Sequence, residues 1–507
     1  MFRTVLVANR GEIAVRIIRA CRELGVRAVA VYSDADAAAP HVALADEAVR
    51  LGPAPPAESY LNIARVIDAA RATGAEAIHP GYGFLAEHAG FAAACRDAGI
   101  VFVGPPAEVI ARLGDKAAAR RLAEAAGVPA VPGYDEPGAS DDAIRAAVAR
   151  MGLPVLLKAA GGGGGKGMRV VRDAAELEVL LASARREAQG AFGDDRIIVE
   201  RLLDRPRHIE VQVLADGRGD AVSLGERECS IQRRHQKIVE EAPSPAVDAA
   251  LRERLGEAAL AVARAAGYAN AGTVEFLVDA AGHFYFLEVN TRLQVEHPVT
   301  ELVTGTDLVQ AQLRLAAGEP LRTVVDAPAV RGHAVECRVY AEDPARGFTP
   351  SPGRILHLAE PSWPHVRVDS GMCAGQDIPT HYDPILAKVA AWGPDRASAV
   401  RRLRAALDDY AVLGPTTNLP FLRAIVAHPA FAAGDLSTAF LEEHFAGWRP
   451  PAPPPEAAVV AAILLADAWG SGASTGASLP PGAGRPAAGA GSASADPWVR
   501  LTGRRLP

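Results

Sequence analysis

The segment at residues 286–301, FLEVNTRLQVEHPVTE, places polar side chains of complementary chemistry at every second position. These are Glu288, Asn290, Arg292 and Gln294. Because side chains alternate across a strand, the four share one face for as long as the chain stays extended. A carboxylate and an amide can bind a cation, and a guanidinium can bind an anion. A site that joins a magnesium nucleotide to a small anion needs this combination.

The preceding residues predict a second carboxylate beside Glu288. Residues 273–279 and 283–289 read as two strands of a hairpin, and a two-residue turn ending at Gly282 would place Glu275 opposite Glu288. Two carboxylates on paired strands repel each other unless a cation lies between them, and Mg²⁺ prefers carboxylate, amide and phosphate oxygens. The alternative is a pair of solvated acids on an exposed sheet face.

A run of five glycines lies within residues 158–168, KAAGGGGGKGM, between two apolar segments. Such a run allows backbone N–H groups to approach phosphate oxygens closely. Lys158 at the end of the first strand and Lys166 on the loop add positive charge. The loop is not a P-loop, because Gly167 stands where that motif has Ser or Thr. The alternative is a flexible linker.

Positive charge is concentrated in residues 226–243, ERECSIQRRHQKIVEEAP. The basic residues are Arg233, Arg234, His235 and Lys237. In a protein with a net charge of −7, this cluster predicts a clamp for phosphates and a carboxylate-like anion. The alternative is a solvated loop whose charges pair with Glu240 and Glu241.

The elements that must position these groups form an α/β protein. Strand, helix and strand alternate over residues 1–113, which predicts an open parallel α/β domain. Further along, alternation over 207–213 predicts a strand with His208, Glu210 and Gln212 on one face. The other expected strands are 153–158, 168–172, 333–340 and 366–369, and the expected helices are 174–190, 248–266 and 457–467.

Bulk composition excludes several classes of protein. The 507 residues are 49% hydrophobic and 22% charged, which is typical of a globular protein with two or three domains. The net negative charge argues against a nucleic-acid binder. Five scattered cysteines predict a reducing, cytoplasmic location, and no apolar run suggests a signal peptide or membrane span.

Taken together, these motifs resemble the biotin carboxylases of the ATP-grasp superfamily. The resemblance covers about residues 2–446 and also includes VLVANRGEIAVRIIRA near the N-terminus, HPGYGFLAE at 79–87 and GHAVECRVYAEDP at 332–344. It implies an N-terminal domain at 1–113, a two-part ATP-grasp domain at 114–330 with a mobile lid at about 131–203, and a C-terminal α+β domain at 331–446.

The resemblance also implies roles for individual residues. Those expected to bind ATP are Lys116, Lys158, Gly164, Gly165, Glu200, Arg201, Leu203, His208, His235, Glu275 and Glu288. Those expected to bind two Mg²⁺ ions, with Mn²⁺ as an alternative, are Glu275, Glu288 and Asn290. Those expected to seat bicarbonate are Lys237, Arg292, Gln294 and the backbone of Val295. Glu296 is expected to be the general base, and Arg338 to stabilise the biotin enolate.

The implied reaction is ATP-dependent carboxylation of biotin through carboxyphosphate, the first half-reaction of an acetyl- or propionyl-CoA type carboxylase. The implied partners are a biotinyl carrier, a carboxyltransferase subunit and a second copy of the chain. Two alternatives stay open, namely another ATP-grasp ligase, such as a carbamoyl or amino-acid ligase, and a non-catalytic subunit. For Arg338 the alternative is a surface arginine paired with Glu336 or Glu342.

Residues 447–507 differ in composition from the rest of the chain. From Gly470 to Ala495 the only charged residue is Arg485, which predicts a flexible segment. None of the four methionines forms the Met-Lys-Met site at which biotin is attached in longer relatives. We therefore expect no biotin on this chain, as either a stand-alone subunit or a longer α-chain cut short before its bridging region.

Overall fold

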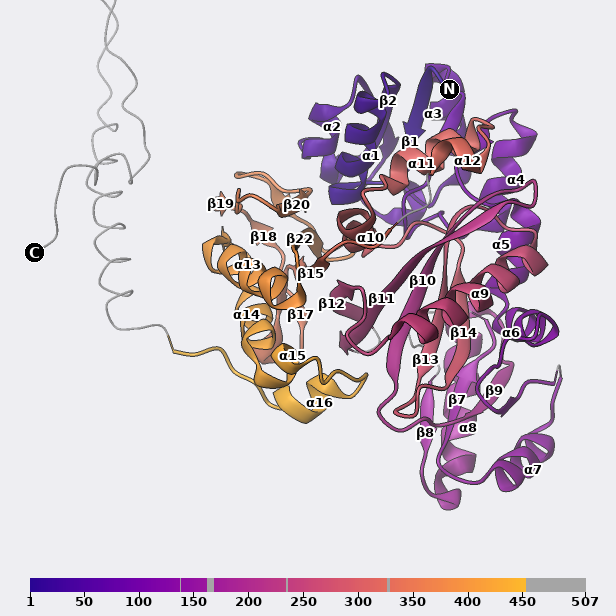
Figure 1. Cartoon of the computed structure of the whole chain (residues 1–507). Coiled ribbons are helices and arrows are strands. Elements are labelled where there is room, and N and C mark those ends of the chain that lie inside the picture. The colour runs from indigo at the N-terminus through magenta and orange to yellow at the C-terminus, as the bar shows by residue number, and fades with distance from the viewer. Residues whose placement is uncertain (137, 162–167, 234–235, 326–328, 453–507) are drawn as a thin grey trace, which may run out of the picture. The chain divides into compact units, whose positions relative to one another are not determined.

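A five-stranded parallel sheet forms the N-terminal part of the chain, as the alternation of strands and helices predicts (Figure 1). Its order is β3 (Glu47–Gly52), β2 (Arg27–Ser33), β1 (Thr4–Val7), β4 (Ala77–His79) and β5 (Val101–Phe102). The sequence analysis did not predict β3. The helices of this part are α1 (Gly11–Glu23), α2 (Pro40–Leu44), α3 (Ile63–Thr73), α4 (Ala89–Asp97) and α5 (Ala107–Gly114).

The structure is a computed structural model that describes residues 1–136, 138–161, 168–233, 236–325 and 329–452. Residues 1–448 form one compact unit. The predicted helix at 457–467 and the flexible segment at 470–495 lie outside the described residues.

A small four-stranded sheet carries the ends of the glycine run. Its order is β6 (Gly133–Tyr134), β9 (Ile197–Arg201), β7 (Val155–Ala159) and β8 (Arg169–Val171). Its helices are α7 (Asp141–Met151) and α8 (Leu177–Phe192), and α6 (Lys116–Ala125) precedes it. Since β7 and β8 pair antiparallel, the loop joins two strands, as predicted.

The largest sheet has eight antiparallel strands and includes the C-terminal strands. The sequence analysis assigned residues 333–340 and 366–369 to a separate third region, but β12 pairs directly with β15 and so makes the sheet continuous. The order is β14 (Phe284–Asn290), β13 (Ala269–Val278), β10 (Arg207–Asp216), β11 (Ala221–Arg233), β12 (Gln236–Ala242), β15 (His333–Tyr340), β22 (Ile385–Gly393) and β20 (Val366–Ser370).

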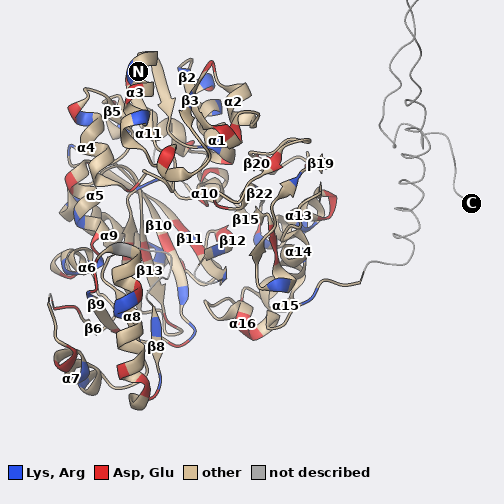
Figure 2. Ribbon diagram, turned by 180° about the vertical axis from the view of Figure 1, so that it is seen from behind, with Lys and Arg blue, Asp and Glu red and all other residues tan. Residues whose placement is uncertain are grey.

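Helices cover this sheet with apolar faces. α9 (Ala249–Ala266) packs on β10 and β11, and α13 (Arg396–Asp409) packs on β15 and β22. The remaining long helices are α10 (His297–Thr304), α11 (Leu308–Ala316) and α14 (Leu419–Ala427). Figure 2 shows acidic and basic residues interleaved over the parts of the fold, including the strands of the large sheet.

The hairpin between β13 and β14 confirms one prediction and corrects another. Glu275 lies opposite Glu288, as expected. The predicted two-residue turn is wrong, because the Asp279 N–H donates to the His283 carbonyl at 2.9 Å and so closes a three-residue loop. An irregularity between Glu275 and Phe276 shifts the register back, with Leu287 as the extra residue on β14.

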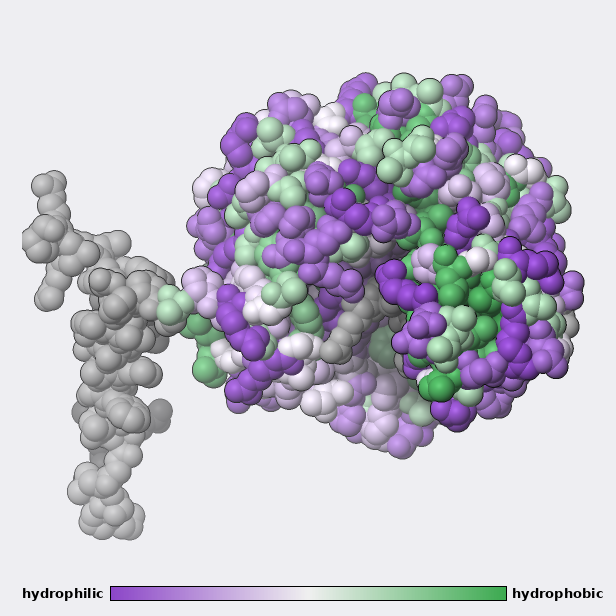
Figure 3. All heavy atoms as spheres, turned by 90° about the horizontal axis from the view of Figure 1, so that it is seen from below, coloured by the Kyte–Doolittle hydropathy of each residue, from purple (hydrophilic) through white to green (hydrophobic). Residues whose placement is uncertain are grey.

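Within the part of the chain that the structure describes, no helix has the length and apolar character needed to cross a membrane. Seen from below, much of the visible surface is hydrophilic, with hydrophobic residues gathered in smaller areas (Figure 3).

Candidate functional site

A row of charged side chains crosses four neighbouring strands of the large sheet. The register places Arg227 on β11 opposite Glu210 on β10, Glu210 opposite Glu275 on β13, and Glu275 opposite Glu288 on β14. Residues directly opposite each other on paired strands point to the same face. The sheet therefore brings three carboxylates into line, beginning beside a buried guanidinium.

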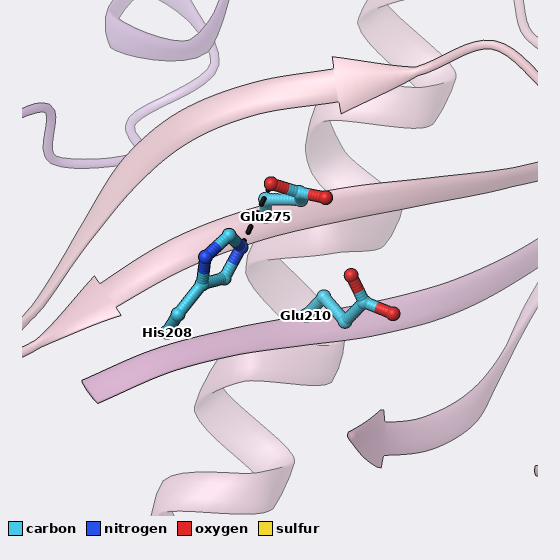
Figure 4. A group of neighbouring side chains, drawn as sticks. All are labelled: His208, Glu210 and Glu275. Atoms are coloured by element: carbon cyan, nitrogen blue, oxygen red, sulfur yellow. Dashed lines mark hydrogen bonds and ion pairs between the residues drawn. The ribbon is translucent and has the colours of Figure 1, made fainter. Parts of the chain in front are cut away.

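Glu275 accepts contacts from several groups that the sequence analysis selected. His208 Nε2 lies 2.7 Å from one carboxylate oxygen, and the other accepts from Lys237 Nζ at 2.8 Å and Asn290 Nδ2 at 2.8 Å. Figure 4 shows His208 and Glu275 directed toward each other, with Glu210 beside them. Burial opposes ionisation of Glu275, but Lys237 and His208 hold its pKa well below the usual range.

Lys237 joins three carboxylates at the centre of the site. Its Nζ donates to Glu210, to Glu275 and, at 2.7 Å, to Glu296 Oε1. Burial disfavours the charged amine, but Glu210, Glu275 and Glu296 raise its pKa well above the ordinary value. The ammonium therefore supplies local positive charge where an anionic substrate would bind. The alternative of a solvated loop is wrong for this residue, since Lys237 is largely buried on strand β12.

Strand β14, which opens the motif at residues 286–301, ends at Asn290. Alternation as far as Gln294 would have required a longer strand. Arg292 and Gln294 nevertheless stay next to the end of β14, because Arg292 donates to Gln294 Oε1 at 2.6 Å and to Asn290 Oδ1 at 3.2 Å. Gln294 in turn donates to Glu275 at 3.1 Å. A further contact, from Arg292 Nε to Glu87 at 2.9 Å, holds the guanidinium against the N-terminal part of the chain.

Arg338 is buried and points into this site. Its Nη2 donates to Glu296 Oε2 at 2.9 Å and its Nε donates to Glu240 Oε1. The alternative of a surface arginine paired with Glu336 or Glu342 is therefore wrong. Burial disfavours the Glu296 carboxylate, but Lys237, Arg338 and Arg227 hold its pKa well below the usual range. Glu296 is thus an ionised carboxylate at neutral pH that two cations orient.

The residues expected around the nucleotide lie where β7 meets α6. Lys116, at the first position of α6, forms an ion pair with Glu288, and its N–H donates to the Ala160 carbonyl at 3.1 Å. Lys158 on β7 forms an ion pair with Glu200 on β9. The backbone contact therefore brings both lysines to one side of the site.

The other expected nucleotide residues are placed as follows. Arg201 ends β9 with an exposed side chain, and Leu203 follows it, partly buried. Gly164, Gly165 and His235 lie outside the described residues.

The side-chain oxygens of Glu275, Glu288 and Asn290 suit a divalent cation. Glu275 and Glu288 lie opposite each other, and Asn290 contributes an amide on the same strand as Glu288. Carboxylate and amide oxygens that leave room for phosphate oxygens are the ligands that Mg²⁺ prefers. A second trio, His208, Glu210 and Glu275, places ligand atoms within 4.8 Å of one another. There the Lys237 ammonium already donates to both carboxylates and supplies the positive charge.

One supporting residue, Arg227, was not predicted. Arg227, fully buried, donates to Glu210, Gln212, Thr273 and Thr300. The shared face of Glu210 and Gln212 was the available signal, because a buried carboxylate and amide side by side require a donor.

Cys229 is a buried, packed thiol. Burial raises its pKa well above the ordinary value, and its Sγ lies 3.9 Å from Glu296 Oε1. A thiol with a raised pKa is a poor nucleophile, because the thiolate is the reactive form. His79 shapes the chain just after β4, since its Nδ1 accepts from the Gly81 N–H at 3.0 Å.

Three family models match nearly the whole compact unit. They are the biotin carboxylase N-terminal domain at residues 1–110, the carbamoyl-phosphate synthase L chain ATP-binding domain at 115–324, and the biotin carboxylase C-terminal domain at 336–443.

Curated relatives show the same similarity. The chain is 50% identical over 442 residues to a biotin carboxylase of Nostoc, covering 87% of this chain and 99% of that protein. It is 49% identical over 441 residues to the mouse methylcrotonoyl-CoA carboxylase subunit alpha, covering 87% of this chain but 62% of that subunit. The chain thus spans less than two thirds of the mouse subunit and nearly all of the Nostoc protein.

A solved structure supports the same relationship. The biotin carboxylase domain dimer of Hydrogenobacter thermophilus 2-oxoglutarate carboxylase, in complex with MgADP, ADP and bicarbonate, superposes with a TM-score of 0.85 at 46% identity. The match covers 88% of this chain and 98% of that one.

Proposed function

The chain belongs to the biotin carboxylase family, and we propose that it uses ATP and bicarbonate to carboxylate biotin on a biotinyl carrier. The observation that carries this proposal is the buried chain of contacts from Arg338 through Glu296 to Lys237. It places an ionised carboxylate between two cations, and Lys237 connects it through Glu275 to Gln294 and Arg292. A proton acceptor within a cationic pocket suits a substrate that is an anion and must lose a proton to react.

In this proposal Lys237, Arg292, Gln294 and the Val295 backbone hold bicarbonate. Glu296 accepts its proton, which makes the bicarbonate oxygen nucleophilic toward the γ-phosphoryl group of ATP. Lys116, Lys158 and His208 orient the phosphates. Bound Mg²⁺, held by Glu275, Glu288 and Asn290, would neutralise phosphate charge. The attack forms carboxyphosphate and releases ADP. Carboxyphosphate then breaks into CO₂ and phosphate, the ureido nitrogen of biotin gives its proton to that phosphate, and the nitrogen captures the CO₂ beside Arg338.

The partners are proposals of the same kind. We propose a biotinyl carrier protein or domain, a carboxyltransferase and a homodimer in the cytoplasm. The final acceptor depends on the carboxyltransferase, and we propose an acyl-CoA of the acetyl or propionyl type. The names of the relatives above include methylcrotonoyl-CoA and 2-oxoglutarate, so the acceptor needs its own measurement.

The test is ADP release with Mg-ATP, with bicarbonate and free biotin each added or withheld. We expect release that requires bicarbonate and that biotin stimulates. Release that depends on ammonia or an amino acid, without biotin, would instead support another ATP-grasp ligase. Failure to bind Mg-ATP in calorimetry would support a non-catalytic subunit.

Replacing Arg338 with glutamine is expected to impair the biotin-dependent step while leaving nucleotide binding intact. The variant loses the guanidinium beside Glu296, so biotin stimulation should fall by about 10²-fold, as when one charge-stabilising donor is removed. Calorimetric affinity for Mg-ATP should change little, because the lysines at the phosphates are untouched. Biotin stimulation equal to that of the wild type would contradict the role given to Arg338.

A further inference from the structure

We propose that Lys388 is a positioning residue that holds the bicarbonate-binding segment, residues 291–296, in place from the C-terminal strands. This inference rests on the proposed function. Lys388 lies on β22, opposite Arg338 on β15, and only 1% of its surface is exposed. Its Nζ donates to the main-chain carbonyl of Val295 at 3.0 Å. A buried ammonium is costly to desolvate, so its partners should account for its presence.

The Val295 carbonyl is a point where control of the backbone has a direct chemical consequence. The strand ends at Asn290 and α10 begins at His297, so the residues between them have no sheet partner. The peptide unit that contains the Val295 carbonyl is planar and extends to the Cα of Glu296. A hydrogen bond to that carbonyl therefore restrains the proposed bicarbonate ligand and the proposed base together.

Two carboxylates from different parts of the chain keep Lys388 in position. Glu12, in the first turn of α1, lies 3.3 Å from Nζ, and Asp369 on β20 lies 3.7 Å from it. Asp369 is itself fixed by Arg367, which donates to it through Nε and Nη2 at 3.0 and 2.7 Å. The ammonium therefore connects the N-terminal part, the bicarbonate segment and the C-terminal strands.

Close backbone packing makes this junction rigid. A Cβ added at Gly371, just after β20, would lie 2.5 Å from the main-chain nitrogen of Glu12. The helix that follows the bicarbonate-binding segment, α10, is fixed as well. Glu301 on α10 accepts from Arg16 of α1 at 3.0 Å and from Arg367 at 2.6 Å. The end of the segment and the helix that follows it are thus tied, through Val295 and Glu301, to α1 and to the C-terminal strands.

Lys388→Met tests the proposal, because it removes the ammonium and keeps most of the side-chain stem. We expect the KM for bicarbonate to rise about tenfold or more, since small misplacements of reacting groups are costly. The KM for ATP should change less than about twofold, because no nucleotide residue contacts Lys388 in the described structure. Amide hydrogen exchange in residues 291–299 should become faster than in the wild type.

Glu12→Gln is the matched control, since it removes a neighbouring charge and retains the donor to Val295. Asp369 and the Val295 carbonyl still hold the ammonium in this variant, so its KM for bicarbonate and its exchange in 291–299 should change much less than in Lys388→Met. The double variant Glu12→Gln/Lys388→Met avoids leaving Glu12 as an unpaired buried charge, and its KM for bicarbonate should stay raised. A wild-type KM for bicarbonate and wild-type exchange in the double variant would overturn the positioning role. If the wild type shows no bicarbonate-dependent ADP release, the proposed function is overturned and the kinetic inference fails with it. The hydrogen-exchange comparison does not depend on activity and would still report the restraint by Lys388.

Discussion

Glu296→Gln should reduce biotin carboxylation by ~10²–10⁴-fold, the usual range for loss of a general base. The amide is nearly the same size as the carboxylate, but its single oxygen replaces two acceptors, one facing Lys237 and one facing Arg338. It also cannot accept a proton from bicarbonate. Despite burial, Lys237 and Arg338 hold the pKa of Glu296 well below its usual range, so the wild-type residue is ionised at neutral pH and has a free site for a proton, although the same shift makes it a weaker base. Bicarbonate-dependent ADP release and carboxybiotin formation are the measurements.

The control for this variant is nucleotide binding, because Glu296 makes no contact with the lysines at the proposed phosphate site in the described structure. Calorimetric affinity for Mg-ATP should therefore stay close to that of the wild type. Glu253→Gln, at an exposed position on α9, is a matched substitution that should leave turnover unchanged. Wild-type turnover in Glu296→Gln would refute the assignment of the base, and a loss of ATP affinity would indicate a structural role instead.

Local sequence patterns predicted the part of the site that lies on adjacent strands. Glu275 and Glu288 face each other although the predicted turn was wrong, because the extra residue Leu287 compensates for the three-residue loop. Hairpin pairing is local, so an error of one residue in the turn can be corrected within the same two strands. The same locality explains why the shared face of His208, Glu210 and Gln212 was correctly predicted.

The contacts around Glu296 could not be derived from local patterns. Arg338 and Lys388 reach Glu296 and Val295 because β12 pairs with β15, and β15 with β22, across long stretches of chain. From sequence alone, Arg338 could equally have paired with its neighbours Glu336 and Glu342. The resemblance to a family assigned Arg338 a role, whereas its burial and its contacts with Glu240 and Glu296 required the structure.

Arg227→Met should strongly destabilise the large sheet, although Arg227 is not a predicted substrate ligand. The guanidinium is fully buried and donates to Gln212 at 2.8 Å, Thr300 at 2.9 Å and Thr273 at 3.1 Å, as well as to Glu210. Removing Arg227 takes one of two cations from the buried Glu210 carboxylate, and breaking a buried ion pair typically costs about 3–5 kcal/mol. Differential scanning calorimetry should show a clearly lower midpoint of thermal unfolding than in the wild type.

The double variant Arg227→Met/Glu210→Gln distinguishes this electrostatic cost from a loss of packing. In Arg227→Met the buried Glu210 carboxylate keeps Lys237 but loses its second cation. If this loss of charge compensation causes the destabilisation, the neutral amide of Glu210→Gln should recover a substantial part of the lost thermal midpoint. Lys237 still has Glu275 and Glu296 as partners, so the second substitution does not strand its ammonium. A double variant no more stable than Arg227→Met would show that the four hydrogen bonds and the packing of the guanidinium, rather than charge compensation, determine the stability of this row.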